Sequence, residues 1–470
     1  MLKASKAEKR VLGVDARARW RAACCAPIQV FASGALAAAA LGLLLTVPAV
    51  GQQAASPAPQ EPAAQAAQAA QQTPGAAGAL SWEEVRAKFE AANPSLLAGA
   101  IGIEESKAQE VTAYLRPNPS FTALLDQIDP FTTNPSHPLA MALPSGTITY
   151  LHEREHKREL RRDSAKEATG IAVSQQSDLE RNLLFTLRTA FVQTLQQKAV
   201  LDVARENLTY YDHVLGVDRE KYKAGGIAQV DLDRLELQRV QFESDLQVAL
   251  VNLRTAKIQL LTLLDDRTPV EQFDVIGLFD FNNQLAGLDE FRQIALDNRP
   301  DLRAAMAAVD KAKTDHQLAV ANGSTDPTFG FDGGKNPPIE HYIGFSVQIP
   351  LRIFDRNQGE KLRTKLDIDK NAQLLELQRA QVFSDVDSAY AMVESNVALL
   401  QPYKERYLKI ADRVRDTISF SYQHGAASLL DFLDAQKEYR DTQLNYLNLV
   451  GSYLTAASQL NQAVGREVLQ

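Results

Sequence analysis

Two histidines separated by one helical turn are the residues with the most obvious potential for chemistry. His152-Glu153-Arg154-Glu155-His156 has the form H-E-x-x-H. In metalloproteases this pattern places two zinc ligands on one face of a helix and uses the glutamate as general base. Such a site also needs a third ligand and an open position for water. The motif raises the hypothesis of a zinc hydrolase, which its surroundings must support.

The surroundings of this motif do not favour zinc catalysis. His152 directly follows an expected strand, "GTITYL", instead of standing in the middle of a helix. The motif opens into the basic run "HKRELRR", and nearby cations disfavour a bound dication. No His or Glu further along the chain stands in a recognisable third-ligand context. We therefore expect no enzyme activity and no cofactor, and leave open only a surface metal site at His152 and His156.

Composition and charge limit the class of protein. The 470 residues are 45% hydrophobic and 23% charged, which is typical of an ordered chain. The formal net charge of −8 argues against a nucleic-acid partner.

The N-terminus predicts export. Residues 1–21 carry seven Lys/Arg and two Asp/Glu, and an apolar run from Val30 to Val50 follows. Small residues at the end of that run fit a signal-peptidase site, so we expect a signal peptide over residues 1–51; an uncleaved membrane anchor is the alternative. Both cysteines precede the apolar run, so we expect no lipidation. Residues 52–80 are mostly Ala, Gln, Pro and Gly, and we expect a flexible linker.

Proline spacing predicts very long helices. No proline occurs between Pro144 and Pro269, or between Pro350 and Pro402, and proline is excluded from helix interiors. These windows are rich in Leu, Ala, Gln, Arg and Glu, which are good helix formers. Residues 153–222 are expected to form one helix, roughly 100 Å long. A compact domain has no use for a helix of that length.

The chain is also duplicated. The stretch "KYKAGGIAQVDLDRL" matches "SYQHGAASLLDFLDA" at an offset of 200 residues, which pairs Tyr222 with Tyr422, Gly225 with Gly425 and Asp231 with Asp431. Glycine belongs at these points because a helix commonly ends in a left-handed residue. Further matches in the same order predict two repeats, residues 81–284 and 285–470.

Each repeat contains two candidate strands between its helices. The clearest, "HYIGFSVQIPL", alternates apolar and small or polar residues with period two. Its expected partner is "PTFGFDGG"; the first repeat offers "PSFTALLDQI" and "GTITYL". A membrane barrel needs at least about eight strands and no open edge, so four strands cannot close a barrel alone. If these are membrane strands, several chains must share one barrel.

These features together resemble the TolC-type outer-membrane efflux proteins. The resemblance covers the chain from Ser81 onward and is carried by the "NP/RP-x-L" helix starts, the junction "FSVQIPLRIFDRNQGE" and the second glycine hairpin. It implies a mainly α fold with a small membrane β-barrel: a homotrimer with a 12-stranded barrel in the outer membrane and a periplasmic tunnel of helical hairpins. It also implies a periplasmic adaptor and an inner-membrane pump as partners. The phrase "IPLRIFDRNQGE" is most similar to the heavy-metal branch, which implies an RND-type pump.

The resemblance also assigns residues to the periplasmic entrance. The family pattern of a tyrosine, a glycine and two later aspartates falls on Tyr422, Gly425, Asp431 and Asp434. Threefold symmetry would turn Asp431 and Asp434, three residues apart on one helix face, into two carboxylate rings that bind cations. A solvated helix face is the alternative.

The first repeat supplies equivalent entrance positions. Asp231 occupies the position equivalent to Asp431 and is therefore assigned to the entrance as well. Tyr222 shares with Tyr422 either a gating role or simple helix-end packing. The turn glycines Gly225, Gly226 and Gly425 are expected to form the tips that face the adaptor. Some relatives tie the hairpins shut with an arginine where this chain has Ala427, so we expect a different closing network, with His424 and Lys223 as candidates.

The basic run after His152 has a role in this scheme. Lys157, Arg158, Arg161 and Arg162 stand where a strand leaves the membrane and a helix begins, so they are expected to contact lipid phosphates or neighbouring helices. Two other functions remain as alternatives: the outer-membrane component of type I protein secretion, and a periplasmic coiled-coil scaffold. The alternating strands argue against the scaffold.

Overall fold

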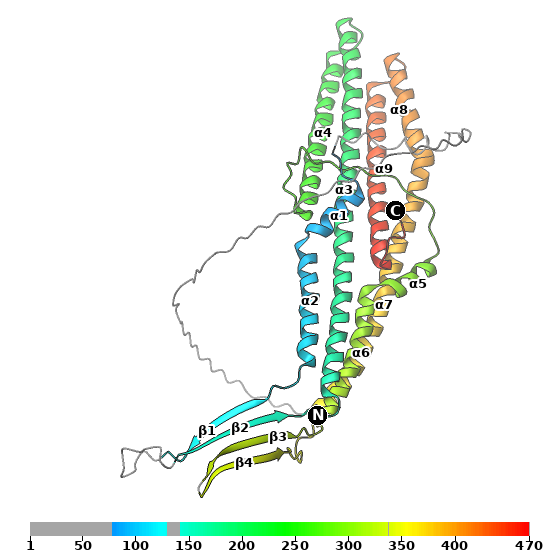
Figure 1. The fold of residues 1–470 in the computed structure, drawn as a ribbon. Coiled ribbons are helices and arrows are strands. Elements are labelled where there is room, and N and C mark those ends of the chain that lie inside the picture. Colours follow the sequence, from blue (N-terminus) through cyan, green and yellow to red (C-terminus); the bar gives the residue numbers. More distant parts are fainter. Residues whose placement is uncertain (1–77, 129–141, 337, 470) are drawn as a thin grey trace, which may run out of the picture. The chain divides into compact units, whose positions relative to one another are not determined.

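The computed structural model describes residues 78–128, 142–336 and 338–469. The expected signal peptide and nearly all of the expected linker lie outside these residues. The described chain is mainly helical, with one sheet of four strands (Figure 1). The expected fold of long helices and four strands is therefore confirmed for one protomer.

The order of elements in the first half is repeated in the second. The first half contains α1 (Trp82–Ala92), α2 (Pro94–Tyr114), β1 (Ser120–Asp126), β2 (Leu143–Leu151), α3 (Lys157–Lys223) and α4 (Gln229–Leu263). The second half contains α5 (Leu288–Asn298), α6 (Pro300–Ala321), β3 (Thr328–Asn336), β4 (Ile339–Gln348), α7 (Gln358–Pro402), a π-helix (Tyr403–Tyr407), α8 (Leu408–Gln423) and α9 (Leu429–Val464). The observed order thus follows the duplication read from the sequence, although the exact repeat boundary stays a prediction.

The long helices of the two halves differ in one respect. α3 runs for 67 residues without interruption, roughly 100 Å. The matching helix of the second half is divided, because Pro402 ends α7 and a five-residue π-helix precedes α8. Proline has no N–H to donate to the preceding turn, which favours such a local change of hydrogen bonding. Next to this point the Lys404 Nζ lies 2.5 Å from the Asp280 carboxylate, on the loop that links the two halves.

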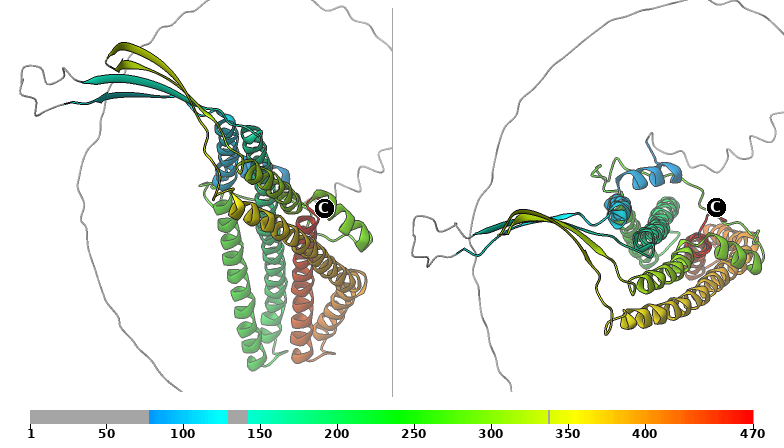
Figure 2. Two further views of the ribbon diagram at one scale, coloured as in Figure 1. Left: turned by 90° about the horizontal axis from the view of Figure 1, so that it is seen from below. Right: turned by 60° about the horizontal axis from the view of Figure 1, so that its bottom comes forward.

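The helices pack into a continuous arrangement of neighbours. α3 contacts α2, α4, α6 and α9, while α7 contacts α6 and α9, and α8 contacts α9. Figures 1 and 2 show the α3–α4 hairpin beside the α8–α9 hairpin. Leu235 and Phe242 of α4, with Tyr211 of α3 and Phe432 of α9, share one buried apolar cluster. The two hairpins are therefore joined by a common core.

The four strands form one antiparallel sheet in the order β1-β2-β3-β4. One row across this sheet consists of large apolar residues in register, Phe121, Ile148, Phe331 and Phe345. These four side chains are between 51% and 71% exposed in the single chain. The adjacent row consists of Thr122, Thr147, Asp332 and Gly344, whose side chains point to the opposite face because strand residues alternate. The sheet therefore has one apolar and one polar face, and neither face is an ordinary protein core.

Candidate functional site: the hairpin ends

The two glycine turns have the same geometry. Gly225 and Gly425 adopt φ values of 76° and 77°, the left-handed region in which glycine is favoured. In both turns the glycine N–H donates to the carbonyl of the preceding tyrosine, with N···O distances of 2.9 Å at Tyr222 and 3.1 Å at Tyr422. Gly226 differs, because it is not among the residues with positive φ. The predicted structural role of the two equivalent glycines thus has a direct geometric basis.

Asp431 caps the helix that leaves the second turn. Its carboxylate accepts hydrogen bonds from the Ser428 hydroxyl (2.7 Å) and the Ser428 backbone N–H (3.1 Å), while its own N–H donates to the Ser428 hydroxyl. These hydrogen bonds from Ser428 hold the pKa of Asp431 below its ordinary value. A carboxylate at this helix N-terminus is also favoured by the helix dipole. The residue is therefore kept ionised at the hairpin end.

The other two predicted aspartates lie close to the same turns. Asp434 is exposed on α9, three residues after Asp431. Asp231, in the first turn of α4, is partly buried and lies 3.9 Å from the Arg234 guanidinium. All three acids are thus at the N-terminal ends of the returning helices, as the duplication predicts. Their assignment to pore rings depends on neighbouring protomers and stays a prediction.

The two tyrosines have different environments. Tyr422 is 9% exposed, and its ring stacks on Phe432 at a centroid distance of 4.9 Å. Burial, followed by the nearby Asp218 carboxylate, raises the pKa of the Tyr422 hydroxyl. Tyr222 is 38% exposed. The pairing of Tyr222 with Tyr422 therefore holds in sequence position but not in surroundings.

Asp218 is a site residue that sequence reasoning missed. It lies on α3 and is 1% exposed, with the Lys221 Nζ 3.4 Å from its carboxylate. By contrast, the two residues predicted as closing contacts interact within their own helix. Lys223 pairs with Glu220 at 2.7 Å, and the His424 ring packs on Phe420. Asp218 was missed because a single acidic residue in a long polar helix gives no sequence signal that its side chain is buried.

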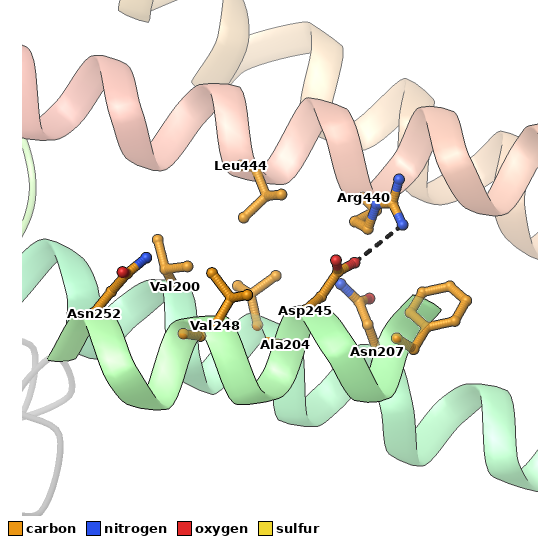
Figure 3. Close-up of a pocket in the computed structure, with 11 residues that line it drawn as sticks. Val200, Ala204, Asn207, Asp245, Val248, Asn252, Arg440 and Leu444 are labelled. Atoms are coloured by element: carbon orange, nitrogen blue, oxygen red, sulfur yellow. Dashed lines mark hydrogen bonds and ion pairs between the residues drawn. The ribbon is translucent and has the colours of Figure 1, made fainter. Parts of the chain in front are cut away.

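A second contact between the hairpins lies further from the turns. Arg440 of α9 places its guanidinium 3.2 Å from Asp245 of α4 (Figure 3). The pair stands at one side of a cavity of about 160 Å³ between α3, α4 and α9. Apolar side chains such as Val248 and Leu444 line much of the cavity. This ion pair fixes the relative position of two elements from different repeats.

The H-E-x-x-H motif does not have zinc-site geometry. His152 to Arg154 are outside any helix, and Glu155 and His156 adopt left-handed φ values of 56° and 54°. The two histidines therefore cannot share a helix face, which the zinc pattern requires. In the described part of the chain, no three His, Cys, Asp or Glu side chains gather as a metal site would need.

The basic run instead stabilises the strand-to-helix junction. Lys157 is 3% exposed, and its Nζ lies 2.6 Å from the Asp326 carboxylate, just before β3. Arg161 pairs with Glu153, while the Arg158 guanidinium lies 4.3 Å from the centre of the Tyr114 ring of α2. Arg162 packs on the same ring. Of the two expected roles, contact with neighbouring helices is the one that the structure shows.

Among the described helices, none has an apolar stretch that would suffice to cross a bilayer.

Comparison with known proteins then identifies the family. Residues 291–466 match the sequence profile described as "Outer membrane efflux protein". The cobalt-zinc-cadmium resistance protein CzcC of Cupriavidus metallidurans is 23% identical over 83% of this chain and 91% of its own length. The outer membrane protein TolC of Vibrio cholerae is 21% identical over 76% of this chain and 86% of its own.

Solved structures show the same fold. The channel CusC superposes with a TM-score of 0.69 at 16% identity, over 82% of this chain and 92% of that one. The open-state channel MtrE of Neisseria gonorrhoeae gives 0.67 at 17% identity, over 85% and 95%. Residues 291–466 therefore belong to the outer membrane efflux protein family, and the described chain has the fold of the solved outer-membrane channels.

Proposed function

We propose that three copies of this chain form a passive duct that carries substrate from a periplasmic adaptor and an inner-membrane pump to the exterior. The observation that carries this proposal is the four-stranded sheet. Its apolar row of Phe121, Ile148, Phe331 and Phe345 faces away from any core, as a lipid-facing surface does.

The edges of the sheet support a shared barrel. β1 and β4 are the two outer strands, so each has one side without a partner within the described chain. Unpaired backbone groups are costly in a bilayer, and only closure of the sheet removes them. Three four-stranded sheets joined edge to edge supply twelve strands, enough for closure. A homotrimer is therefore the assembly that we expect.

The hairpin ends are the proposed contact with the adaptor and pump. The turns at Gly225 and Gly425 are close to one another, because the hairpins share a core. The adaptor is expected to bind these turns, and an RND-type pump is expected behind it. The relative CzcC is a cobalt-zinc-cadmium resistance protein, which favours divalent metal cations over drugs as the substrate.

The carboxylates at the entrance are compatible with that substrate class. Asp431 is ionised and Asp434 is exposed on the same helix, so a trimer would place six acid groups around one axis. We expect these groups to bind divalent cations transiently as the cations enter. The same rings would let a divalent cation block the channel when it is added from the entrance side.

The experiment uses the purified full-length protein in detergent and in planar bilayers. A trimer that conducts ions and is blocked by divalent cations supports the proposal, while a monomer without conductance contradicts it. Asp431→Asn with Asp434→Asn should weaken the block by roughly tenfold or more. Asp233→Asn is the matched control, because Asp233 is exposed on α4 but has Leu433, not an acid, as its duplicate. Equal block in all three proteins would refute the rings.

The substrate class is tested in cells. A strain without this gene should become sensitive to cobalt, zinc or cadmium and regain resistance with the wild-type gene. Sensitivity to drugs alone would contradict the metal assignment while leaving the channel function intact.

A further inference from the structure

The junction loop, residues 349–357, joins β4 to α7 and exposes a group of large apolar side chains. Ile349, Leu351 and Ile353 are 54%, 79% and 61% exposed, and Phe354 is 90% exposed. Contiguous apolar groups on a protein surface mark sites of contact with a partner or a membrane. The junction loop therefore needs a covering that the described residues of a single chain do not supply.

Hydrogen bonds hold the junction loop in this conformation. The Asn357 side-chain amide donates to the Ala319 carbonyl of α6 (2.7 Å), and the Asn357 backbone N–H donates to the Asp355 carboxylate (2.8 Å). The Gln358 side-chain amide donates to the Phe354 carbonyl (3.2 Å). The loop is thus tied to α6 on one side and to the start of α7 on the other. The exposure of Phe354 is a fixed feature of the fold.

The first repeat shows that the fold accepts a polar residue at this point. β2 leads into α3 as β4 leads into α7, and the residue before each helix is left-handed, at His156 and at Asn357. Aligning these two residues pairs Glu153 with Phe354. An exposed phenylalanine where the fold accepts a glutamate is typical of a binding surface.

The apolar side chains of the junction loop continue the pattern of β4. On this strand Phe345 and Val347 are exposed, and they share the face proposed above to contact lipid. Ile349 and Leu351 continue the same alternation beyond the last residue of the strand. Aromatic side chains are enriched where barrel strands leave the hydrocarbon region. Phe354 is thus expected at the level of the lipid headgroups.

Two arginines accompany these apolar side chains. Arg352 and Arg356 stand on the junction loop together with one acid, Asp355. The Asp355 carboxylate accepts the Asn357 N–H, and within the described residues the Arg352 Nε has no hydrogen-bond partner. Basic residues beside apolar ones are typical of segments that lie in the membrane interface and pair with lipid phosphates. The junction loop therefore has the chemistry of a phospholipid site.

A second copy of the chain is the alternative covering, and its charges fit less well. Adjacent strands of the sheet run in opposite directions, so pairing of β4 with β1 of the next protomer places the junction loop beside the segment that leads into β1. Residues 111–125 contain Arg116 and no acid. The two arginines of the loop would therefore meet a third cation instead of a carboxylate, which is unfavourable. A phosphate group is the better partner.

We propose that the junction loop binds an anionic phospholipid of the periplasmic leaflet of the outer membrane. Leu351 and Phe354 enter the acyl region, and Arg352 and Arg356 bind the phosphate of the headgroup. The proposal rests on the duct function proposed above, because the barrel brings the loop to the membrane. The bound lipid fixes the depth at which the strands end and the helices begin.

Quenching of tryptophan fluorescence by brominated lipids tests this site in the full-length protein reconstituted into vesicles. The vesicles contain brominated phosphatidylglycerol, which is anionic, or brominated phosphatidylcholine, which is zwitterionic. Phosphatidylglycerol should quench the Phe354→Trp variant with an apparent affinity several-fold higher than that of phosphatidylcholine, after correction for the quenching of the wild-type protein. Met392→Trp is the matched control, because Met392 is 49% exposed and lies roughly 55 Å further along α7, and it should show no quenching.

Substitution of the arginines separates the headgroup from the depth. In the Phe354→Trp background, Arg352→Gln with Arg356→Gln should remove the preference for phosphatidylglycerol and leave the quenching itself. Arg363→Gln is the matched control, because Arg363 is exposed on α7 but pairs with Glu360, and it should keep the preference. Equal affinity for the two lipids before any arginine is changed would overturn the headgroup site. Absence of quenching would overturn the whole proposal and indicate that a second copy covers the loop.

Phe345→Trp distinguishes this failure from that of the channel. It reports the apolar row of β4, within the proposed barrel wall. Quenching of Phe345→Trp without quenching of Phe354→Trp would refute the phospholipid site alone. Absence of quenching in both variants would refute the lipid-facing sheet, and with it the proposed duct.

Discussion

The two faces of the sheet lead to a quantitative prediction at neighbouring positions of β3. Phe331 belongs to the apolar row, between Ile148 and Phe345, and is 52% exposed in the single chain. Asp332, the next residue, belongs to the polar row. We compare Phe331→Lys with Asp332→Lys, which place the same side chain on opposite faces of one strand.

The magnitude follows from the position of Phe331 in the sheet. It lies near the middle of β3 (Thr328–Asn336), and so near the middle of the proposed barrel wall. A lysine on the lipid face near the bilayer midplane costs about 2–4 kcal/mol. Loss of the phenylalanine side chain from lipid adds about 1–2 kcal/mol. Phe331→Lys should therefore destabilise each protomer by roughly 3–6 kcal/mol, and the effect occurs three times in a trimer.

The assay is urea unfolding of the protein folded into lipid vesicles, with trimer survival in detergent as a second readout. Asp332→Lys should change the unfolding free energy by about 1 kcal/mol or less, because lysine on a polar, hydrated face is tolerated. Equal destabilisation by the two variants would refute the assignment of the faces. A larger effect for Asp332→Lys would mean that the apolar row faces the inside.

Three further predictions concern the helical part. Arg299, which is 3% exposed, pairs with Asp301 and Asp385. Arg299→Met should lower the unfolding free energy by about 1–3 kcal/mol, because it removes these charge-assisted contacts while both carboxylates keep other partners. Thermal unfolding followed by circular dichroism checks this, and an unchanged melting temperature would contradict it. Gly425→Val should disturb the second turn and reduce cross-linking to the adaptor, because φ is 77° there and a β-branched residue disfavours that conformation. Gly425→Asn should retain most of the cross-linking, because asparagine tolerates a left-handed φ. Equal cross-linking of the two variants would show that the turn does not position the adaptor. The lowered pKa of Asp431 means that its stabilising cap is present above the ordinary Asp pKa and is lost only as pH falls through the lower folded value. Cation block should therefore persist into acid solution and disappear at a higher pH in Ser428→Ala; identical pH profiles would contradict this.

Helices, strands and turns could be predicted because each follows from a periodic or local signal. The abundance of strong helix formers and the absence of proline predicted a helix over residues 153–222, and α3 spans Lys157–Lys223. Period-two alternation predicted β4, and the duplication predicted that Gly225 and Gly425 occupy equivalent turns. These signals are repeated along the chain, so a single misread residue does not change the result.

The features that escaped prediction depend on contacts between distant segments. Asp218 is buried beside the apolar cluster that α3, α4, α8 and α9 share, and its sequence neighbours do not indicate this burial. The different surroundings of Tyr222 and Tyr422 arise in the same way. A short motif can mislead because its residue types do not determine the backbone conformation. The H-E-x-x-H pattern does not indicate that Glu155 and His156 adopt left-handed φ values.

The open edges at β1 and β4 have a consequence for genetics. A subunit with one defective edge can still pair with a normal subunit through its intact edge, and the barrel that results stays unclosed. With equal synthesis of normal and defective chains, only about one eighth of randomly formed trimers contain three normal subunits. Edge mutations in this gene should therefore be dominant over the wild-type allele, whereas mutations that prevent export of the chain should be recessive.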